Sequence, residues 1–177
     1  LGALALTGYA PMTAPFDPMM HPMPKIPAPR AYLDRLDMTL EETGRHYANM
    51  LEERILQEGP ETVLAFIVEP VGGASTGALV PPAGYMGRIR EICNEYDILL
   101  IHDEVMTGGG RTGRFFAAEH WDVEPDILVI SKGFAAGYAP LGAMIAHDAI
   151  VEPVLAAGGF QHGYTYAGNP LACAADR

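Results

Sequence analysis

Three short aliphatic runs, each followed by polar residues, constrain the fold of this chain most strongly. The runs span residues 63–68, 98–101 and 127–130. Each has the length and the continuous apolar character of a buried strand, and residues 63–68 are of the kind buried on both faces. Helical patterns separate the runs, and the repeated order of helix and strand predicts a mostly parallel sheet with crossovers. We therefore expect an α/β fold.

The expected helices are recognisable by their ends. Residues 39–42 fit a capping box, an apolar stripe follows them, and Gly59-Pro60 stops the helix. Prolines at residues 81–82 open a second helix, whose apolar stripe includes Cys93. We expect Cys93 to be a buried free thiol and a shorter helix to span residues 115–121.

The remaining segments break this alternation. A fourth strand is expected over residues 141–146, and it follows the third too closely for a helical crossover. We therefore expect it to be antiparallel to its predecessor. Seven prolines between residues 10 and 32 predict an irregular connection there. The chain starts without methionine inside an apolar segment, and residues 170–177 look like the start of a helix. We expect a fragment of a longer chain.

Charge and cysteine content limit the class of partner. The formal net charge is −11 at pH 7, which argues against nucleic acid and anionic membranes as partners. No apolar run approaches the roughly 20 residues of a membrane span. Only two cysteines occur, which fits a reducing cytoplasm rather than a disulfide framework.

Lys132 and Asp103 are the most informative polar residues. Each follows one of the aliphatic runs, and ligands of open α/β sheets gather outside the carboxyl ends of the strands. A lysine there can form a Schiff base, and an aspartate can hold a protonated ring nitrogen. Taken singly, Lys132 could be a solvated lysine, and Asp103 could be a helix cap or a turn acid. A metal cluster that includes His102 and Glu104 is a further alternative.

Three other segments are weaker candidates. Residues 107–113, with four glycines and Arg111, could cradle a phosphate as a backbone nest or could form a flexible turn. Glu69 follows the first aliphatic run and is either a site acid or a surface acid. Thr165 lies in a polar-aromatic loop, and its hydroxyl group could bind phosphate.

Together these segments resemble the class III (ω) aminotransferases of the fold-type-I pyridoxal-phosphate family. The matching stretches are FIVEPVGGASTGALVPPAGY, ILLIHDEVMTGGGRTGRFFAAEHW, PDILVISKG, APLGAMIA and HGYTYAGNPLACAA. The resemblance implies a three-layer sandwich with a mostly parallel sheet, the large domain of the aspartate aminotransferase-like fold. On this view residues 1–177 are the central part of an incomplete large domain, and the N-terminal segment and the C-terminal small domain are absent.

The resemblance also implies roles for individual residues. Lys132 would be the Schiff-base lysine and proton shuttle, and Asp103 would pair with the pyridine nitrogen. Val105 would pack against one face of the pyridoxal 5'-phosphate ring, and Met106 would stand where several relatives carry a glutamine near the ring hydroxyl. Thr165 would reach the cofactor phosphate of a partner subunit. Glu69 would be an active-site acid next to the residues that contact the ligand. The resemblance implies no metal site.

Departures from the family pattern narrow the expected substrates. Ornithine- and 4-aminobutyrate-type relatives carry a second glutamate after Glu69, where this chain has residues 73–76, Gly-Ala-Ser-Thr. This difference favours a pyruvate-linked transaminase of amines or ω-amino acids. Gly109 replaces a common aromatic residue. The family's phosphate loop, stacking aromatic residue and substrate arginine fall outside the sequence, so we expect the 177-residue chain alone to be inactive.

The resemblance implies transfer of an amino group from an amine or ω-amino acid to a 2-oxo acid, by a cytoplasmic homodimer or dimer of dimers. Two alternatives remain open. One is a racemase or aminomutase on the same scaffold, which would also use Lys132 and Asp103. The other is a catalytically silent truncated chain that acts as an interaction module.

Overall fold

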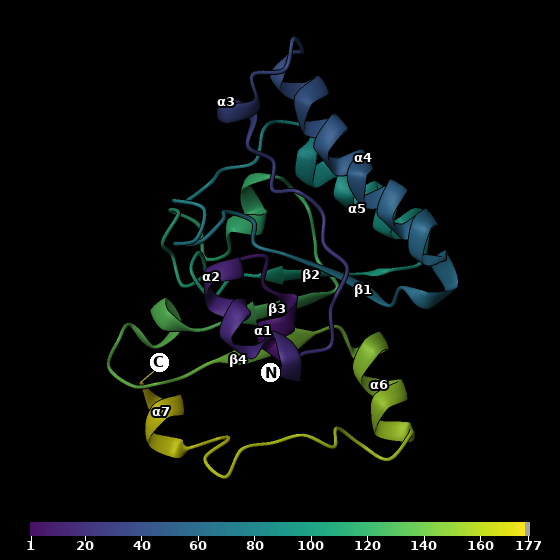
Figure 1. Ribbon diagram of the computed structural model, residues 1–177. Helices are drawn as coiled ribbons and strands as arrows, with labels where there is room; N and C mark the ends of the chain where they lie inside the picture. Colours follow the sequence, from purple (N-terminus) through teal and green to yellow (C-terminus); the bar gives the residue numbers. More distant parts are fainter. Residues whose placement is uncertain (176–177) are drawn as a thin grey trace.

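A four-stranded sheet forms the centre of the computed structural model, which describes residues 1–175. Its strands are β1 (Ala65–Val68), β2 (Leu99–Asp103), β3 (Ile127–Ile130) and β4 (Ala143–Ala146), in the order β1-β2-β3-β4. The first three strands are parallel, and β4 is antiparallel to β3. The mostly parallel sheet and the antiparallel fourth strand are confirmed (Figure 1).

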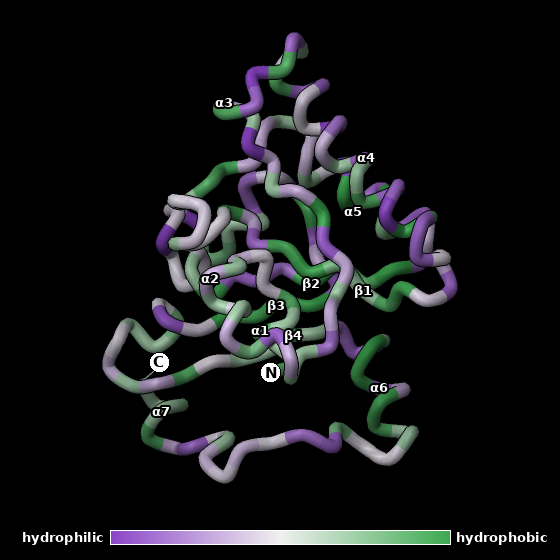
Figure 2. Tube along the Cα trace, in the orientation of Figure 1, coloured by the Kyte–Doolittle hydropathy of each residue, from purple (hydrophilic) through white to green (hydrophobic). Residues whose placement is uncertain are grey.

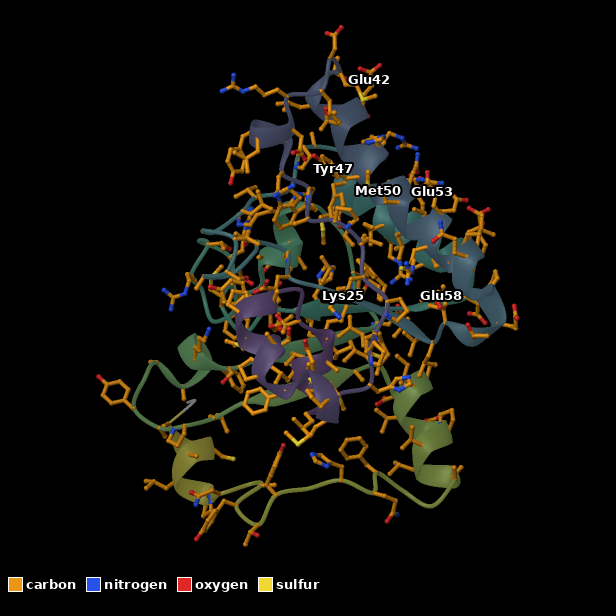
Figure 3. All side chains as sticks on the ribbon, in the orientation of Figure 1. Lys25, Glu42, Tyr47, Met50, Glu53 and Glu58 are labelled. Carbon is orange, nitrogen blue, oxygen red and sulfur yellow. The ribbon has the colours of Figure 1, made fainter. Side chains whose placement is uncertain are left out.

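Two long helices cover one face of this sheet. Helix α4 (Leu40–Glu58) begins with the expected capping box, in which the Glu42 amide donates to Thr39 Oγ1 and the Thr39 amide donates to the Glu42 carboxylate. Helix α5 (Tyr85–Glu95) packs against both α4 and β2. The acidic side chains Glu53 and Glu58 lie on the outer edge of α4 (Figure 3). These two helices are therefore amphipathic covers whose apolar stripes meet over the sheet.

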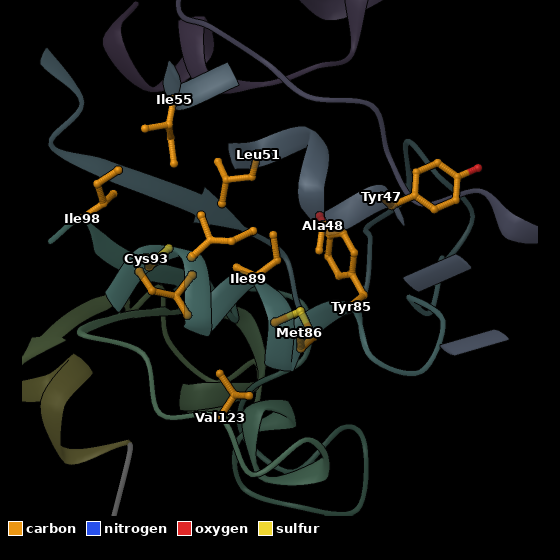
Figure 4. Close-up of a cluster of buried hydrophobic side chains, with 12 residues drawn as sticks. Tyr47, Ala48, Leu51, Ile55, Tyr85, Met86, Ile89, Cys93, Ile98 and Val123 are labelled. Atoms are coloured by element: carbon orange, nitrogen blue, oxygen red, sulfur yellow. The ribbon is translucent and has the colours of Figure 1, made fainter. Parts of the chain in front are cut away.

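The hydrophobic core lies where α4, α5 and the sheet meet. Leu51 and Ile55 from α4 meet Ile89 from α5 (Figure 4). Leu100 extends the cluster into β2. Cys93 is also buried there, as expected, and burial raises the pKa of its thiol to about 11. This thiol is therefore protonated at neutral pH and packs as a small apolar group.

The strands are covered less completely than the aliphatic runs suggest. Along β2 the side chains of Leu100 and His102 are fully buried, whereas those of Leu99, Ile101 and Asp103 are only partly buried. All four residues of β1 are partly buried. The expectation that residues 63–68 are buried on both faces is therefore wrong for β1, where no side chain is fully buried.

The proline-rich N-terminal segment is more ordered than expected. It contains α2 (Ala10–Thr13) and a 3-10 helix, η1 (Ala14–Met19), after a first short helix, α1 (Gly2–Leu6). Pro11 and Pro15 each stand in the first turn of their helix, where a missing amide proton costs nothing. The amine of Lys25 then donates to the carbonyl of Ala5 at 2.9 Å.

Beyond β4 the chain follows an extended path. Helix α6 (Asp148–Ala156) and the short α7 (Pro170–Ala174) flank residues 157–169, most of which are exposed. Figure 2 shows that α6 is strongly apolar. The expected helix over residues 115–121 is shorter, a 3-10 turn η3 (Ala117–His120). The helix expected from residue 170 is present as α7, and residues 176–177 lie outside the described part. Within residues 1–175, no helix has the length and apolar character that a membrane crossing needs.

His102 gives the stability of this fold a pH dependence. It is fully buried on the face of β2 that also carries Leu100, and neither ring nitrogen has a hydrogen-bond partner among the described residues. Burial, and secondarily the charge of Arg90, lowers the pKa of His102 from 6.5 to about 4. The folded protein therefore holds this ring neutral.

Between pH 6.5 and 4 the unfolded chain binds a proton that the folded chain excludes, so stability falls as the pH falls. The free energy of unfolding should drop by about 2 kcal/mol between pH 6.5 and 5 through this group. Urea unfolding at pH 7 and pH 5 measures the drop. A His102→Leu variant should lose less stability over this range, and an equal loss in both proteins would contradict the assignment.

Candidate active site

Polar residues from three neighbouring strands meet at the carboxyl edge of the sheet. Glu69 follows β1, Asp103 is the last residue of β2, and Lys132 comes two residues after β3. The register aligns Val68 with His102, and Asp103 with Val129. Adjacent strands lie ~4.8 Å apart, so the parallel pairing brings these three positions to one edge. Asp103 belongs to β2 itself, because the strand extends two residues beyond the aliphatic run.

Asp103 lies on the less buried face of β2. Its neighbours His102 and Glu104 are fully buried, whereas Asp103 is only partly buried, as the alternation of side chains along a strand requires. Its Oδ1 atom accepts a hydrogen bond from the amide of Val105 at 3.0 Å. The carboxylate is thus oriented by its own turn, and Oδ2 remains available to a ligand. Among residues 1–175 no group of three or more histidines, cysteines or acids is arranged to hold a metal ion.

Glu104 has a structural role, whereas the sequence offered it only as a metal ligand. Its buried carboxylate accepts hydrogen bonds from Thr107 Oγ1 at 2.5 Å and from the amides of Ala117 and Ala118 at 2.9 and 2.8 Å. These bonds tie both ends of the loop after Asp103 to the end of β2. The hydroxyl group three residues after Glu104 is the one sequence signal that could have indicated this role.

The loop that Glu104 anchors carries the other residues expected near the ring. Val105 and Met106 follow Asp103 and are partly buried. The carbonyl of Met106 accepts a hydrogen bond from Arg111 Nε at 2.8 Å. The guanidinium group of Arg111 therefore folds back onto its own glycine-rich loop.

Lys132 has an unusual backbone conformation. Its φ angle is +47°, in the left-handed region that costs a non-glycine residue about 1–2 kcal/mol. It begins the 3-10 helix η4 (Lys132–Ala135), and Ser131 Oγ donates to the carbonyl of Leu141 at 2.7 Å. The Lys132 side chain is exposed and makes no hydrogen bond or ion pair with residues 1–175. Backbone strain of this kind often marks a functional position.

Thr165 is not brought to this edge by the described chain. It lies exposed in the segment between α6 and α7, which runs below β4 in Figure 1. Glu69 is at the edge, and its carboxylate is exposed beside the buried Gly73. Of the expected site residues, Glu69, Asp103, Val105, Met106 and Lys132 therefore gather at or next to the carboxyl edge, and Thr165 does not.

Comparison with known proteins gives one consistent family. A family profile described as aminotransferase class-III matches residues 1–177. A probable aminotransferase of Mycobacterium tuberculosis is 44% identical over 174 residues, which cover 98% of this chain and 37% of the relative. A putrescine–pyruvate aminotransferase of Pseudomonas aeruginosa is 46% identical over 149 residues, 84% of this chain and 32% of the relative. The chain thus spans less than half the length of these curated relatives.

Solved structures agree with this result. An (S)-enantioselective ω-transaminase from Thermomicrobium roseum superposes with a TM-score of 0.89 at 42% identity, covering 98% of this chain and 39% of that one. An ω-transaminase from Pseudomonas jessenii, solved in complex with PMP, gives a TM-score of 0.86 at 37% identity. It covers 99% of this chain and 40% of the solved one. The described sheet and helices therefore have the fold of an incomplete fold-type-I large domain.

Proposed function

The chain belongs to the class-III aminotransferases, and on this basis we propose that it is the central part of the large domain of a transaminase. The full-length protein would transfer an amino group from an amine or ω-amino acid to a 2-oxo acid such as pyruvate. The observation that carries this proposal is the placement of Asp103 and Lys132 at the ends of neighbouring parallel strands. No other two described strands of this sheet present an acid and an amine in this way.

Class-III aminotransferases use pyridoxal 5'-phosphate, and the groups at the sheet edge fit this cofactor. Lys132 offers an exposed primary amine that can bond to a carbonyl carbon. Asp103 offers a partly buried carboxylate with one free oxygen atom. When bound, the cofactor supplies an electron sink that stabilises negative charge on the carbon atom bearing the amino group.

The chain's own residues would supply binding, orientation and proton transfer. The negative charge of Asp103 would favour a protonated pyridine nitrogen, because an opposite charge nearby stabilises the charged form. Val105 would pack on one ring face, and Met106 would lie near the ring hydroxyl. When the substrate amine has taken the place of the lysine amine, Lys132 Nζ would act as a base. It would take a proton from the substrate carbon that bears the amino group.

The remaining roles complete the proposal. Glu69 would be an active-site acid that supports the residues in contact with the ligand without touching the ligand itself. Thr165 would bind the cofactor phosphate of a partner subunit in a homodimer or dimer of dimers, which agrees with its exposure here. We also place the protein in the cytoplasm, a location that suits its free cysteines, Cys93 and Cys173.

An amine donor and pyruvate acceptor are the substrate classes that the chain supports best. The Pseudomonas aeruginosa relative is named for putrescine and pyruvate. Residues 73–76 are Gly-Ala-Ser-Thr, where ornithine- and 4-aminobutyrate-type enzymes carry a second glutamate after the residue equivalent to Glu69. The lack of that glutamate disfavours these two substrate classes.

An amino-transfer assay tests this function. We expect the full-length protein, loaded with pyridoxal phosphate, to convert pyruvate to alanine with an amine donor. The 177-residue chain alone should turn over at less than about a tenth of that rate, a barrier difference of roughly 1.4 kcal/mol. Racemisation or amino-group migration without a 2-oxo acid would identify the racemase or aminomutase alternative. Cofactor absorbance that never develops would favour the silent interaction module.

A further inference from the structure

Glu104 is hydrogen-bonded through its backbone and its side chain at the end of β2. Its amide donates to the carbonyl of Val129 in β3 at 2.8 Å, and its carbonyl accepts from the amide of Gly108 at 2.7 Å. Its fully buried carboxylate accepts the three further bonds described above. Because Asp103 precedes it and Val105 follows it, Glu104 fixes the chain between two residues that we place at the cofactor.

The three donors that meet at the Glu104 carboxylate need an acceptor at both of its oxygen atoms. The amide of Ala118 donates to Oε1, and the amide of Ala117 and the hydroxyl group of Thr107 donate to Oε2. A carboxylate only accepts, whereas a glutamine side chain carries an NH2 group in place of one oxygen. In either orientation that NH2 group would face the amide of Ala117 or Ala118, and donor would meet donor. The surroundings of Glu104 therefore select a carboxylate over an amide.

The orientation of Asp103 depends on the segment that Glu104 holds. Asp103 Oδ1 accepts from the amide of Val105 at 3.0 Å, so the direction of the Val105 peptide group orients the Asp103 carboxylate. Val105 begins the loop of residues 105–118, which the Glu104 carboxylate fixes to the end of β2. Loss of those bonds would free the Val105 amide, and with it the Asp103 carboxylate.

We propose that Glu104 is a positioning residue for Asp103: its buried carboxylate fixes residues 105–118 on the end of β2 and so holds the Val105 amide that orients the Asp103 carboxylate. This inference rests on the proposed function, in which Asp103 keeps the pyridine nitrogen protonated. Glu104 then contributes to the reaction without touching substrate or cofactor, in place of a role as a metal ligand.

The test uses the full-length protein with a Glu104→Gln variant and a matched Glu119→Gln control. Glu119 lies directly after the same loop and is exposed, and its Oε1 accepts from the amide of Phe116 at 2.9 Å. Each change removes one carboxylate and nearly keeps its shape. A glutamine at residue 119 can still accept that single bond, whereas a glutamine at residue 104 cannot accept at both atoms. The difference between the two variants therefore reports the bonds at Glu104.

Two readouts need no turnover. In the cofactor-free protein, hydrogen exchange of the Val105 amide should become roughly tenfold faster in Glu104→Gln than in Glu119→Gln. In the protein loaded with pyridoxal phosphate that is isotope-labelled at the ring nitrogen, the nitrogen chemical shift measures the protonated fraction. The pH at which this nitrogen loses its proton should fall by about one unit in Glu104→Gln alone, because a misplaced carboxylate stabilises the ring charge less.

Turnover should follow the ring nitrogen. Glu104→Gln is expected to lower kcat by about tenfold, since one pKa unit is a tenfold change in the protonated fraction, with KM changed by less than about threefold. Glu119→Gln should keep both parameters. A purely structural role of Glu104 would change the exchange rate and leave the titration of the ring nitrogen as it is.

Both readouts must move in Glu104→Gln for the proposal to stand, so an unchanged ring nitrogen overturns it, with or without faster exchange. If Glu104→Gln does not fold, Thr107→Val decides the question, because it removes one of the three donors and keeps the shape of the side chain. Thr107→Ser restores the hydroxyl group and serves as its control. Smaller changes of the same kind are expected in Thr107→Val alone, and their absence would overturn the proposal equally. A protein whose ring nitrogen responds as expected but that transfers no amino group refutes the proposed function alone.

Discussion

Replacing Lys132 by alanine is expected to lower amino transfer at least about a thousandfold, since general acid–base catalysis alone contributes roughly this factor. The change removes the amine that bonds the cofactor and the base that moves the substrate proton. Lys132 is exposed and unpaired with residues 1–175, so the variant should keep its fold. Steady-state transfer to pyruvate, together with circular dichroism of the same sample, measures both quantities.

A matched control exists in the same chain. Lys25 is the only other lysine among the 177 residues, and its amine donates to the carbonyls of Ala5 and Met23 at 2.9 and 3.1 Å. Lys25→Ala removes the same charge and should retain turnover. Loss of activity in Lys25→Ala, with activity retained in Lys132→Ala, would reverse the assignment. Free methylamine should restore part of the activity of Lys132→Ala, because it supplies the missing base.

Replacing Asp103 by asparagine is expected to lower turnover by roughly ten- to thousandfold. A carboxylate near a titrating nitrogen shifts its pKa by one to three units, and each unit lost is about tenfold in the protonated fraction. Asparagine has nearly the same shape and can still accept the Val105 amide, so the turn should survive. Stopped-flow measurement of the first half-reaction with an amine donor separates this loss from product release.

Two further variants decide whether charge is the cause. Asp103→Glu keeps the charge and should be less impaired than Asp103→Asn if the longer side chain still reaches. Asp103→Ala with a cofactor analogue methylated at the ring nitrogen carries a fixed positive ring charge and should recover activity. Near wild-type turnover in Asp103→Asn, or no recovery with the analogue, would contradict the role of Asp103.

The sequence predicted the parts of this fold that depend on local patterns. The capping box at Thr39, the burial of Cys93 and the antiparallel β4 each follow from neighbouring residues, and all are confirmed. The carboxyl edge also follows from pattern, because parallel strands must end on the same side of a sheet. The order of Glu69, Asp103 and Lys132 along this edge could therefore be predicted from their positions after the strands.

Features that depend on tertiary contacts could not be predicted. The buried role of Glu104 arises from amides 13 and 14 residues away, which no local pattern connects to it. The close approach of Gly109 to the backbone of Gly133 requires the two loops to be placed side by side. The partial exposure of all four β1 residues depends on what packs against the strand, which its apolar run cannot indicate.

Reduction with borohydride, followed by peptide mass mapping, tests the central claim most directly. The full-length protein would be loaded with pyridoxal phosphate, reduced to fix the bond between cofactor and lysine, and digested. We expect a pyridoxyl group on Lys132, the first residue of η4. A pyridoxyl group on Lys25, or on a lysine outside these 177 residues with Lys132 unmodified, would contradict it.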